Sequence, residues 1–117
     1  MPSDIRKIAH IIPPGVVVEV GGGEGVLALA LSKRSDIRKV VSIDLTPART
    51  TAAQELKNRW LELGIECSSK AEVILGDAID ELERIEGADT VVASPEFRSE
   101  FRSHYGSPSS IVFYCAA

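Results

Sequence analysis

The sequence predicts an α/β fold built on a doubly wound, mostly parallel sheet of about five strands. Short runs rich in Val and Ile alternate along the chain with segments of helical character, an alternation typical of parallel sheets. The predicted strands are apolar almost throughout, as strands covered on both faces are. The chain has 117 residues, a length that suits one domain with one core. We therefore expect residues 1–117 to form a single domain.

Composition and charge narrow the classes of function. Hydrophobic residues make up 44% of the chain, charged residues make up 26%, and the formal net charge is −4, so no general polyanion-binding surface is expected. Cys67 and Cys115 lack CxxC spacing and nearby His partners, which predicts two reduced thiols in a cytoplasmic protein and no metal site. No apolar run approaches the roughly 20 residues that span a bilayer, and the first ten residues contain no apolar signal core. We expect no membrane partner.

The first predicted element is a short helix. Ile5, Ile8, Ala9 and Ile12 recur at helical spacing, and two prolines then end the helix. Residues 16–20 (VVVEV) follow as a buried strand.

The middle of the chain predicts two longer helices around a strand. Residues 24–34 (EGVLALALSKR) are strong helix formers with cations at the C-terminal end, and residues 39–44 (KVVSID) are the second strand. Thr46 can cap the next helix, and Pro47 suits its first turn. That helix ends near Gly64. Its apolar stripe consists of Ala48, Ala52, Leu56, Trp60 and Leu63.

The rest of the chain predicts three more strands. Residues 71–75 (AEVIL) are the third strand, residues 78–87 (AIDELERIEG) a short helix that ends at a glycine, and residues 89–94 (DTVVAS) the fourth strand. Residues 95–106 are a weak, short helix or a loop. Residues 109–117 (SSIVFYCAA) are the fifth strand.

A glycine-rich turn separates the first strand from the helix that follows. Four glycines in five residues, which are Gly21, Gly22, Gly23 and Gly25, are costly in any regular element. In doubly wound sheets, ligands bind beyond the carboxyl ends of the strands, and this turn lies at that edge. Glycine there lets a ligand touch the main chain without interference from a Cβ atom.

Two phosphate-binding interpretations of the turn fit poorly. A triphosphate-binding loop needs Gly-Lys-Ser/Thr, which the chain lacks. The dinucleotide pattern GxGxxG would need its third glycine where Val26 stands. It would also bring pyrophosphate to Glu24, beside a helix N-terminus where an anion should be favoured. The turn contains two acids and no Lys or Arg, which disfavours a naked phosphate.

The segment from Glu19 to Gly25 (EVGGGEG) has the form acid-x-G-x-G-x-G and resembles the first motif of class I S-adenosylmethionine-dependent methyltransferases. This cofactor carries a sulfonium and an ammonium and no phosphate, which suits an acidic loop. The resemblance implies a Rossmann-like fold of the methyltransferase type. It implies that Gly21, Gly22, Gly23 and Gly25 face the methionine part and the ribose, and that Glu19 helps to hold the ammonium group.

Two later sites strengthen the resemblance. Asp44 ends the second strand, where the family has an acid that accepts hydrogen bonds from the ribose hydroxyls, and Leu45 follows beside the adenine. Asp77, Ala78 and Ile79 follow the third strand; there the family often has an Asp against the adenine amino group and a backbone N–H facing a ring nitrogen. Each acid alone also has a simpler interpretation as a turn or helix cap.

The resemblance covers about residues 16–95 and implies methyl transfer to an acceptor that the sequence does not identify. No catalytic residue is assigned. Two alternatives stay open. One is a non-catalytic S-adenosylmethionine-binding or interaction module. The other is a spermidine-synthase-like aminopropyltransferase, although the Asp that such enzymes carry after the fourth strand has no counterpart in VVASPEF.

The segment Ser94-Pro95-Glu96-Phe97 partly resembles a motif of methyltransferases that act on exocyclic amino groups of adenine or cytosine. Glu96 replaces the second proline of that motif. Nucleic acid is therefore an alternative partner, but a polar residue followed by Pro is also common turn chemistry. The charged side chains that follow, His104 among them, have the simpler interpretation of a solvated face.

The end of the chain predicts self-association. Members of the family usually continue past the fifth strand, whereas this sequence stops at Ala117. The apolar segment from Ile111 to Cys115 is then expected at an edge of the sheet, where unpaired N–H and C=O groups tend to pair with another chain. We expect a homodimer or a docked partner there.

Overall fold

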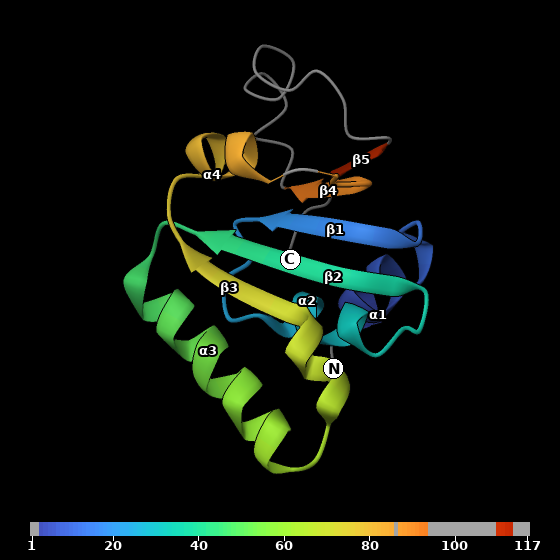
Figure 1. Cartoon of the computed structure of the whole chain (residues 1–117), viewed down its shortest axis with the longest axis vertical. Coiled ribbons are helices and arrows are strands. Elements are labelled where there is room, and N and C mark those ends of the chain that lie inside the picture. Colours follow the sequence, from blue (N-terminus) through green and yellow to red (C-terminus); the bar gives the residue numbers. More distant parts are fainter. Residues whose placement is uncertain (1–2, 86, 94–109, 114–117) are drawn as a thin grey trace.

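The strands run parallel and side by side in the order β3-β2-β1-β4-β5 (Figure 1), which confirms the predicted fold class. The computed structural model describes residues 3–85, 87–93 and 110–113. Within them the strands are β1 Gly15–Val20, β2 Ile37–Asp44, β3 Ala71–Leu75, β4 Thr90–Ala93 and β5 Ser110–Phe113. The chain builds outward from β1 to β3 and then returns to the other side of β1, so the strand order reverses between β1 and β4. Ligands of doubly wound sheets bind beside such a reversal.

Helices pack on both faces of the sheet (Figure 1). The α-helices of the described residues are α1 Ser3–Ile11, α2 Val26–Ser32, α3 Pro47–Glu62 and α4 Ala78–Arg84, and a 3-10 helix, η1, spans Glu66–Lys70. Residues of α1, α2 and α3 pack on one face, and Ala78 of α4 packs on the other. The sequence did not predict η1.

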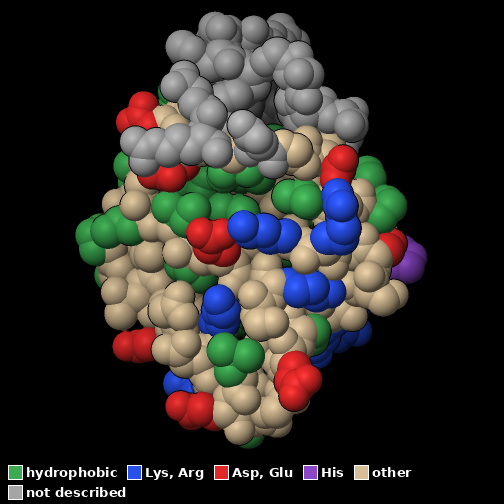
Figure 2. Space-filling model, viewed as in Figure 1, with side chains coloured by type: hydrophobic (Ala, Val, Ile, Leu, Met, Phe, Trp, Pro, Cys, Tyr) green, Lys and Arg blue, Asp and Glu red, His purple; other side chains and the backbone are tan. Residues whose placement is uncertain are grey.

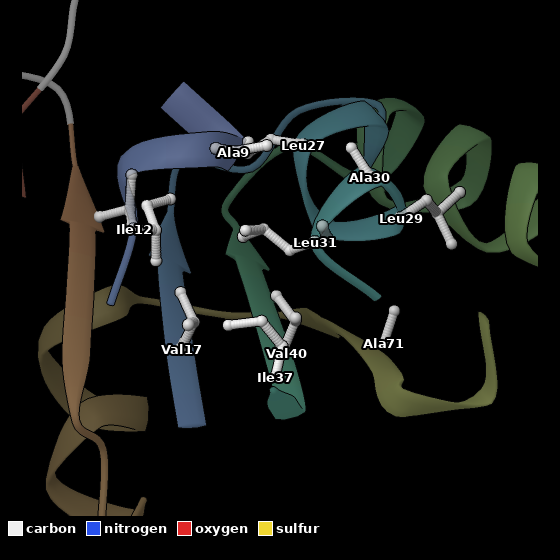
Figure 3. Packing of buried hydrophobic residues seen from close by; sticks show 12 residues of the cluster. Ala9, Ile12, Val17, Leu27, Leu29, Ala30, Leu31, Ile37, Val40 and Ala71 are labelled. Carbon is white, nitrogen blue, oxygen red and sulfur yellow. The ribbon is translucent and has the colours of Figure 1, made fainter. Parts of the chain in front are cut away.

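The core on the α2 face joins three helices to the sheet (Figure 3). Leu27 and Leu31 of α2 belong to one buried cluster with Val17 of β1 and Val40 of β2, and each of the four is at most 3% exposed. Truncation of a fully buried Leu to Ala costs about 2–5 kcal/mol. This packing fixes where α2 begins, and therefore where the glycine turn must end.

The core on the opposite face consists of strand residues with α4 and its following turn packed against them. Val18, Val41 and Val91 are each at most 2% exposed, and Ile74 and Ala78 pack against this cluster. Both faces are therefore covered, as the continuous apolar strands predict.

Arg34 ties α1 to the rest of the molecule. The helix ends at Ile11, just before the prolines, as predicted. The Arg34 guanidinium donates through Nη1 to the carbonyl oxygens of Ala9, at 2.9 Å, and Ile12, at 2.5 Å. Carbonyl groups at a helix C-terminus lack hydrogen-bond donors within the helix, and the Arg34 side chain supplies a donor to these two. The same guanidinium forms two hydrogen bonds, at 2.8 and 2.9 Å, with Asp36.

The predicted stripe of α3 is partly wrong. Ala48 is exposed and Leu63 is 71% exposed, whereas Ala53, which the stripe omits, is 1% exposed. Leu56 and Trp60 do pack against the core. The face of this 16-residue helix that contacts the rest of the fold therefore contains Ala53, Leu56 and Trp60, and it excludes Ala48 and Leu63.

Several predicted boundaries shift. β2 begins at Ile37 rather than at residue 39, and α2 begins at Val26 rather than at residue 24. Thr46 occupies the N-cap position of α3 with Pro at its start, as predicted, but its side chain makes no capping hydrogen bond. The predicted segment 95–106 lies outside the described residues, and so do residues 109 and 114–117 of the last predicted strand.

Candidate functional site

The carboxyl ends of the strands meet at one edge of the sheet, where the arrowheads of β1, β2 and β3 lie together in Figure 1. Because the strands are parallel, the turns that leave them converge there. The glycine turn follows β1, Asp44 ends β2, and Gly76 and Asp77 follow β3. The fold thus gathers all the site residues that the sequence predicts, and we refer to this edge as the site rim.

The glycine turn is held to the end of β2 by backbone hydrogen bonds. The N–H groups of Gly21 and Gly22 donate to the carbonyl oxygen of Ile43, at 2.8 and 3.2 Å. Gly25 N–H donates to Gly22 O at 3.2 Å. Gly21, Gly23 and Gly25 have φ values of +73°, +59° and +83°, a backbone conformation that residues other than glycine rarely adopt. The turn therefore requires glycine at three positions before any ligand is considered.

Packing explains two of the glycines, and one faces open space. A Cβ atom on Gly22 would lie 1.9 Å from Ser42 Oγ, and one on Gly25 would lie 3.0 Å from the Cβ of Ala53. A Cβ atom on Gly23 would meet nothing within 4 Å. The small size of Gly22 and Gly25 thus serves the protein's own packing. Unlike Gly22 and Gly25, Gly23 has open space where a side chain would stand.

Asp44 clamps the turn from β2. Its side chain is nearly buried, with the residue 7% exposed. Oδ2 accepts the N–H of Gly23 at 2.9 Å, and Oδ1 accepts the N–H of Thr46 at 2.8 Å. A carboxylate has about four acceptor sites, so each oxygen can accept one further hydrogen bond. The same side chain can therefore order the turn and bind two hydroxyl groups.

Glu19 lies beneath the turn rather than on its outer surface. It is 1% exposed, and its Oε1 accepts a hydrogen bond from Ser42 Oγ at 3.4 Å. A Cβ atom on Gly22 would lie 2.8 Å from the same carboxylate oxygen. A carboxyl group buried directly under a glycine turn is placed to interact with a cationic group above that turn.

The turn after β3 also matches its predicted place. Asp77 is exposed, and its Oδ1 accepts the N–H groups of Ile79, at 2.8 Å, and Asp80, at 3.4 Å. It therefore caps α4, as the simpler interpretation proposed. Leu45, directly after Asp44, is 67% exposed. Ala78 packs against the core below, so α4 is anchored beside the rim.

Positive charge gathers away from the site rim. Figure 2 shows Lys and Arg side chains clustered in front of the sheet, and a shallow hollow there is lined by Arg38, Lys39, Lys57 and Lys70. Arg38 and Lys39 stand near the start of β2, at the opposite end from Asp44. Part of this charge is neutralised by cross-strand pairing, since Lys39 Nζ lies 2.9 Å from Glu72 Oε2. The described part of the glycine turn has no such cations.

Ser42 is the residue that sequence reasoning missed. It is 2% exposed and forms the floor of the glycine turn together with Glu19. A polar residue inside the apolar run VVSI was the available signal.

Among the helices of the described residues, none combines the length and the hydropathy of a membrane-spanning segment.

Comparison with known proteins identifies the fold. No family model and no curated protein matches the chain. Among solved structures, it is similar to TrmK of M. capricolum in complex with S-adenosylhomocysteine, with a TM-score of 0.71 and 12% identity over 95% of this chain and 49% of that one. A precorrin 8W decarboxylase of Methanobacterium thermoautotrophicum gives a TM-score of 0.76 and 23% identity over 98% of this chain and 63% of that one.

A third structure points to the same fold. A SAM-dependent methyltransferase of Thiobacillus denitrificans, also in complex with S-adenosylhomocysteine, gives a TM-score of 0.65 and 18% identity over 95% of this chain and 47% of that one. The chain thus spans about half the length of two of these proteins. It has the Rossmann-like fold of class I methyltransferases, which confirms the fold that the resemblance implied.

Proposed function

We propose that the chain binds S-adenosylmethionine at the site rim and is a methyltransferase whose acceptor is not identified. The observation that carries the proposal is the Asp44 clamp. Asp44 holds the N–H of Gly23 at 2.9 Å while the space beside Gly23 stays open. A ribose seated there would meet an acidic acceptor and bare backbone together. The S-adenosylhomocysteine complexes of two proteins with this fold support the choice of ligand.

Each rim residue receives a role within this proposal. Asp44 accepts the two ribose hydroxyls on its remaining acceptor sites, since a charged acceptor makes the stronger kind of hydrogen bond. Exposed Leu45 covers one face of the adenine. Asp77 and the backbone of Ala78 and Ile79 bind the adenine edge. The charge of Glu19 offsets the ammonium group from beneath Gly21, Gly22, Gly23 and Gly25.

Two glycines make a matched test of binding. Gly23 and Gly64 both have positive φ, +59° and +81°, and a Cβ atom on either meets nothing within 4 Å. A left-handed conformation costs a non-glycine residue roughly 1–2 kcal/mol, so Gly23→Leu and Gly64→Leu should lose similar stability. Gly64 follows the C-terminal end of α3, whose 16 residues extend about 24 Å from the rim at 1.5 Å per residue.

Isothermal titration calorimetry with S-adenosylhomocysteine then separates ligand contact from backbone strain. We expect saturable binding by the wild type and by Gly64→Leu, and loss of binding by Gly23→Leu. Equal affinities of the two variants would place the ligand elsewhere. Absence of binding to the folded wild type at millimolar concentration, or preferential binding of NAD, would refute the proposed ligand.

Methyl transfer itself is the second step of the proposal. A nucleophile's lone pair forms the bond to the sulfonium methyl carbon, the carbon–sulfur bond breaks, and sulfur keeps its electron pair as a thioether. Such in-line displacement depends mainly on positioning, and a neutral N–H or O–H nucleophile releases its proton to water, so the absence of an assigned catalytic acid or base does not argue against transfer. Mass spectrometry of a cell extract incubated with the protein and labelled cofactor should reveal a methylated product. Binding without any transfer would favour a non-catalytic module instead.

The remaining partner predictions are part of the same proposal. The structure puts β5 at an edge of the described sheet, which supports pairing with a second copy. The base-methylation motif, Ser94-Pro95-Glu96-Phe97, lies outside the described residues, so nucleic acid stays an alternative acceptor. Cys67 is a free thiol, in keeping with the cytoplasmic location that we propose.

A further inference from the structure

We infer that Ser42 is a positioning residue of the cofactor site and acts by fixing the carboxylate of Glu19 beneath the glycine turn. The inference rests on the proposed function, because it assigns Ser42 to the half of the site that binds the amino-acid part of the cofactor. Ser42 itself lies in the interior of β2, two residues before Asp44.

The sheet register brings Ser42 and Glu19 together. Glu19 of β1 pairs directly with Ser42 of β2, so their side chains stand side by side on one face of the sheet. Both are buried, at 1% and 2% exposed, and Ser42 Oγ donates to Glu19 Oε1 at 3.4 Å. A buried carboxylate that loses a donor is penalised by desolvation. The hydroxyl therefore helps to decide where this charge points.

Gly22 couples the pair to the ligand side of the turn. The backbone of Gly22 lies so close above Ser42 that a Cβ atom would stand 1.9 Å from Oγ and 2.8 Å from Glu19 Oε1. The next residue, Gly23, is the one beside open space. The buried pair is thus separated from the proposed ligand by a single layer of backbone, and Ser42 supports both the carboxylate and the turn.

A change at Ser42 should then affect one half of the cofactor. The ammonium group belongs to the amino-acid half, whereas ribose and adenine meet Asp44 and the turn after β3. 5′-Methylthioadenosine has the same adenosine and thioether as S-adenosylhomocysteine but lacks the amino-acid group. The pair of ligands therefore isolates the effect of Ser42 on that half.

The experiment is calorimetry with both ligands on the wild type, Ser42→Ala and Ser68→Ala. Ser68 is the matched control, because it is also fully buried and its hydroxyl donates to the carbonyl oxygen of Ile65, the N-cap residue of η1, at 2.7 Å. We expect Ser42→Ala to weaken S-adenosylhomocysteine by about three- to tenfold, the range of one net hydrogen bond. 5′-Methylthioadenosine should bind unchanged, and Ser68→Ala should change neither affinity.

A double-mutant cycle tests whether Ser42 acts through Glu19. In a Glu19→Gln chain, which keeps the side-chain shape, Ser42→Ala should weaken S-adenosylhomocysteine by clearly less than it does in the wild type. If Ser42→Ala does not fold, Ser42→Cys, which keeps a weak donor of similar size, should show the same selective loss to a smaller extent.

Three results would overturn the inference. The first is an equal loss for both ligands, which would mean a general structural effect; the second is no loss for either; the third is full additivity with Glu19→Gln. Each of these leaves the proposed function standing as long as the wild type binds S-adenosylhomocysteine. Failure of the folded wild type to bind either ligand would instead refute the proposed function and the inference together.

Discussion

Replacement of Asp44 by Ala should weaken both the fold and cofactor binding, by separable amounts. The change removes two charge-assisted hydrogen bonds, to Gly23 N–H at 2.9 Å and to Thr46 N–H at 2.8 Å. Hydrogen bonds to charged groups contribute about 1.5–3 kcal/mol each. The lost bonds lie at the rim, where water can replace them in part, so we expect the free energy of unfolding to fall by about 2–4 kcal/mol.

The ligand effect is superimposed on this loss. If Asp44 accepts the ribose hydroxyls, Asp44→Ala should also weaken S-adenosylhomocysteine by about 1–3 kcal/mol, or roughly 5- to 150-fold. Urea unfolding without ligand measures the first quantity, and calorimetry at a temperature where both proteins are folded measures the second. Asp44→Asn keeps the shape but leaves one N–H facing an amide NH₂ group, so it should be intermediate or equally destabilised.

The stability and affinity measurements test two separate roles of Asp44, and each role has its own contradicting result. A loss of stability with unchanged affinity would make Asp44 a structural clamp only and would refute its ribose role. Unchanged stability would contradict the geometry of the clamp itself.

Three further predictions concern the packing of the fold and its edges. Gly22→Ala should lower the free energy of unfolding by about 1–3 kcal/mol through overpacking against Ser42, and Ser42→Gly in the same chain should recover part of that loss. Arg34→Ala should cost about 1–3 kcal/mol in urea unfolding from the two bonds to α1 carbonyls. The Arg34 guanidinium lowers the pKa of Asp36 by its hydrogen bond, so the pair stabilises the fold at neutral pH. The difference in free energy of unfolding between the wild type and Arg34→Ala should therefore narrow as the pH falls through the lowered pKa of Asp36. Val112→Lys should convert a dimer to a monomer in light scattering at micromolar concentration, whereas a monomeric wild type would show that β5 does not pair with a second copy.

The sheet was predictable because its signal is local. Uninterrupted Val and Ile runs bounded by turn residues predict strands, and Asp44 could be placed at the end of β2 because the polar residue stops such a run. The meeting of the glycine turn, Asp44 and Asp77 at one edge then follows from parallel topology alone.

Packing across the sheet was less predictable. The α3 stripe was partly misplaced because Ala53 lies close to Gly25: a Cβ atom on Gly25 would stand 3.0 Å from the Cβ atom of Ala53. The spacing of apolar residues along the helix does not reveal that contact. The reach of Arg34 to the carbonyls of Ala9 and Ile12 spans 22–25 residues of sequence. Ser42 gained its significance only from the register that puts it beside Glu19.

The most direct test of the cofactor site is a titration of ¹⁵N-labelled protein with S-adenosylhomocysteine, followed by the backbone amide chemical shifts. We expect shifts concentrated at the site rim, in residues 21–25, 44–46 and 77–79, with little change at Arg38 and Lys39 near the start of β2. Shifts centred on Arg38 and Lys39 near the start of β2, or no shifts at saturating ligand, would contradict the proposed cofactor site.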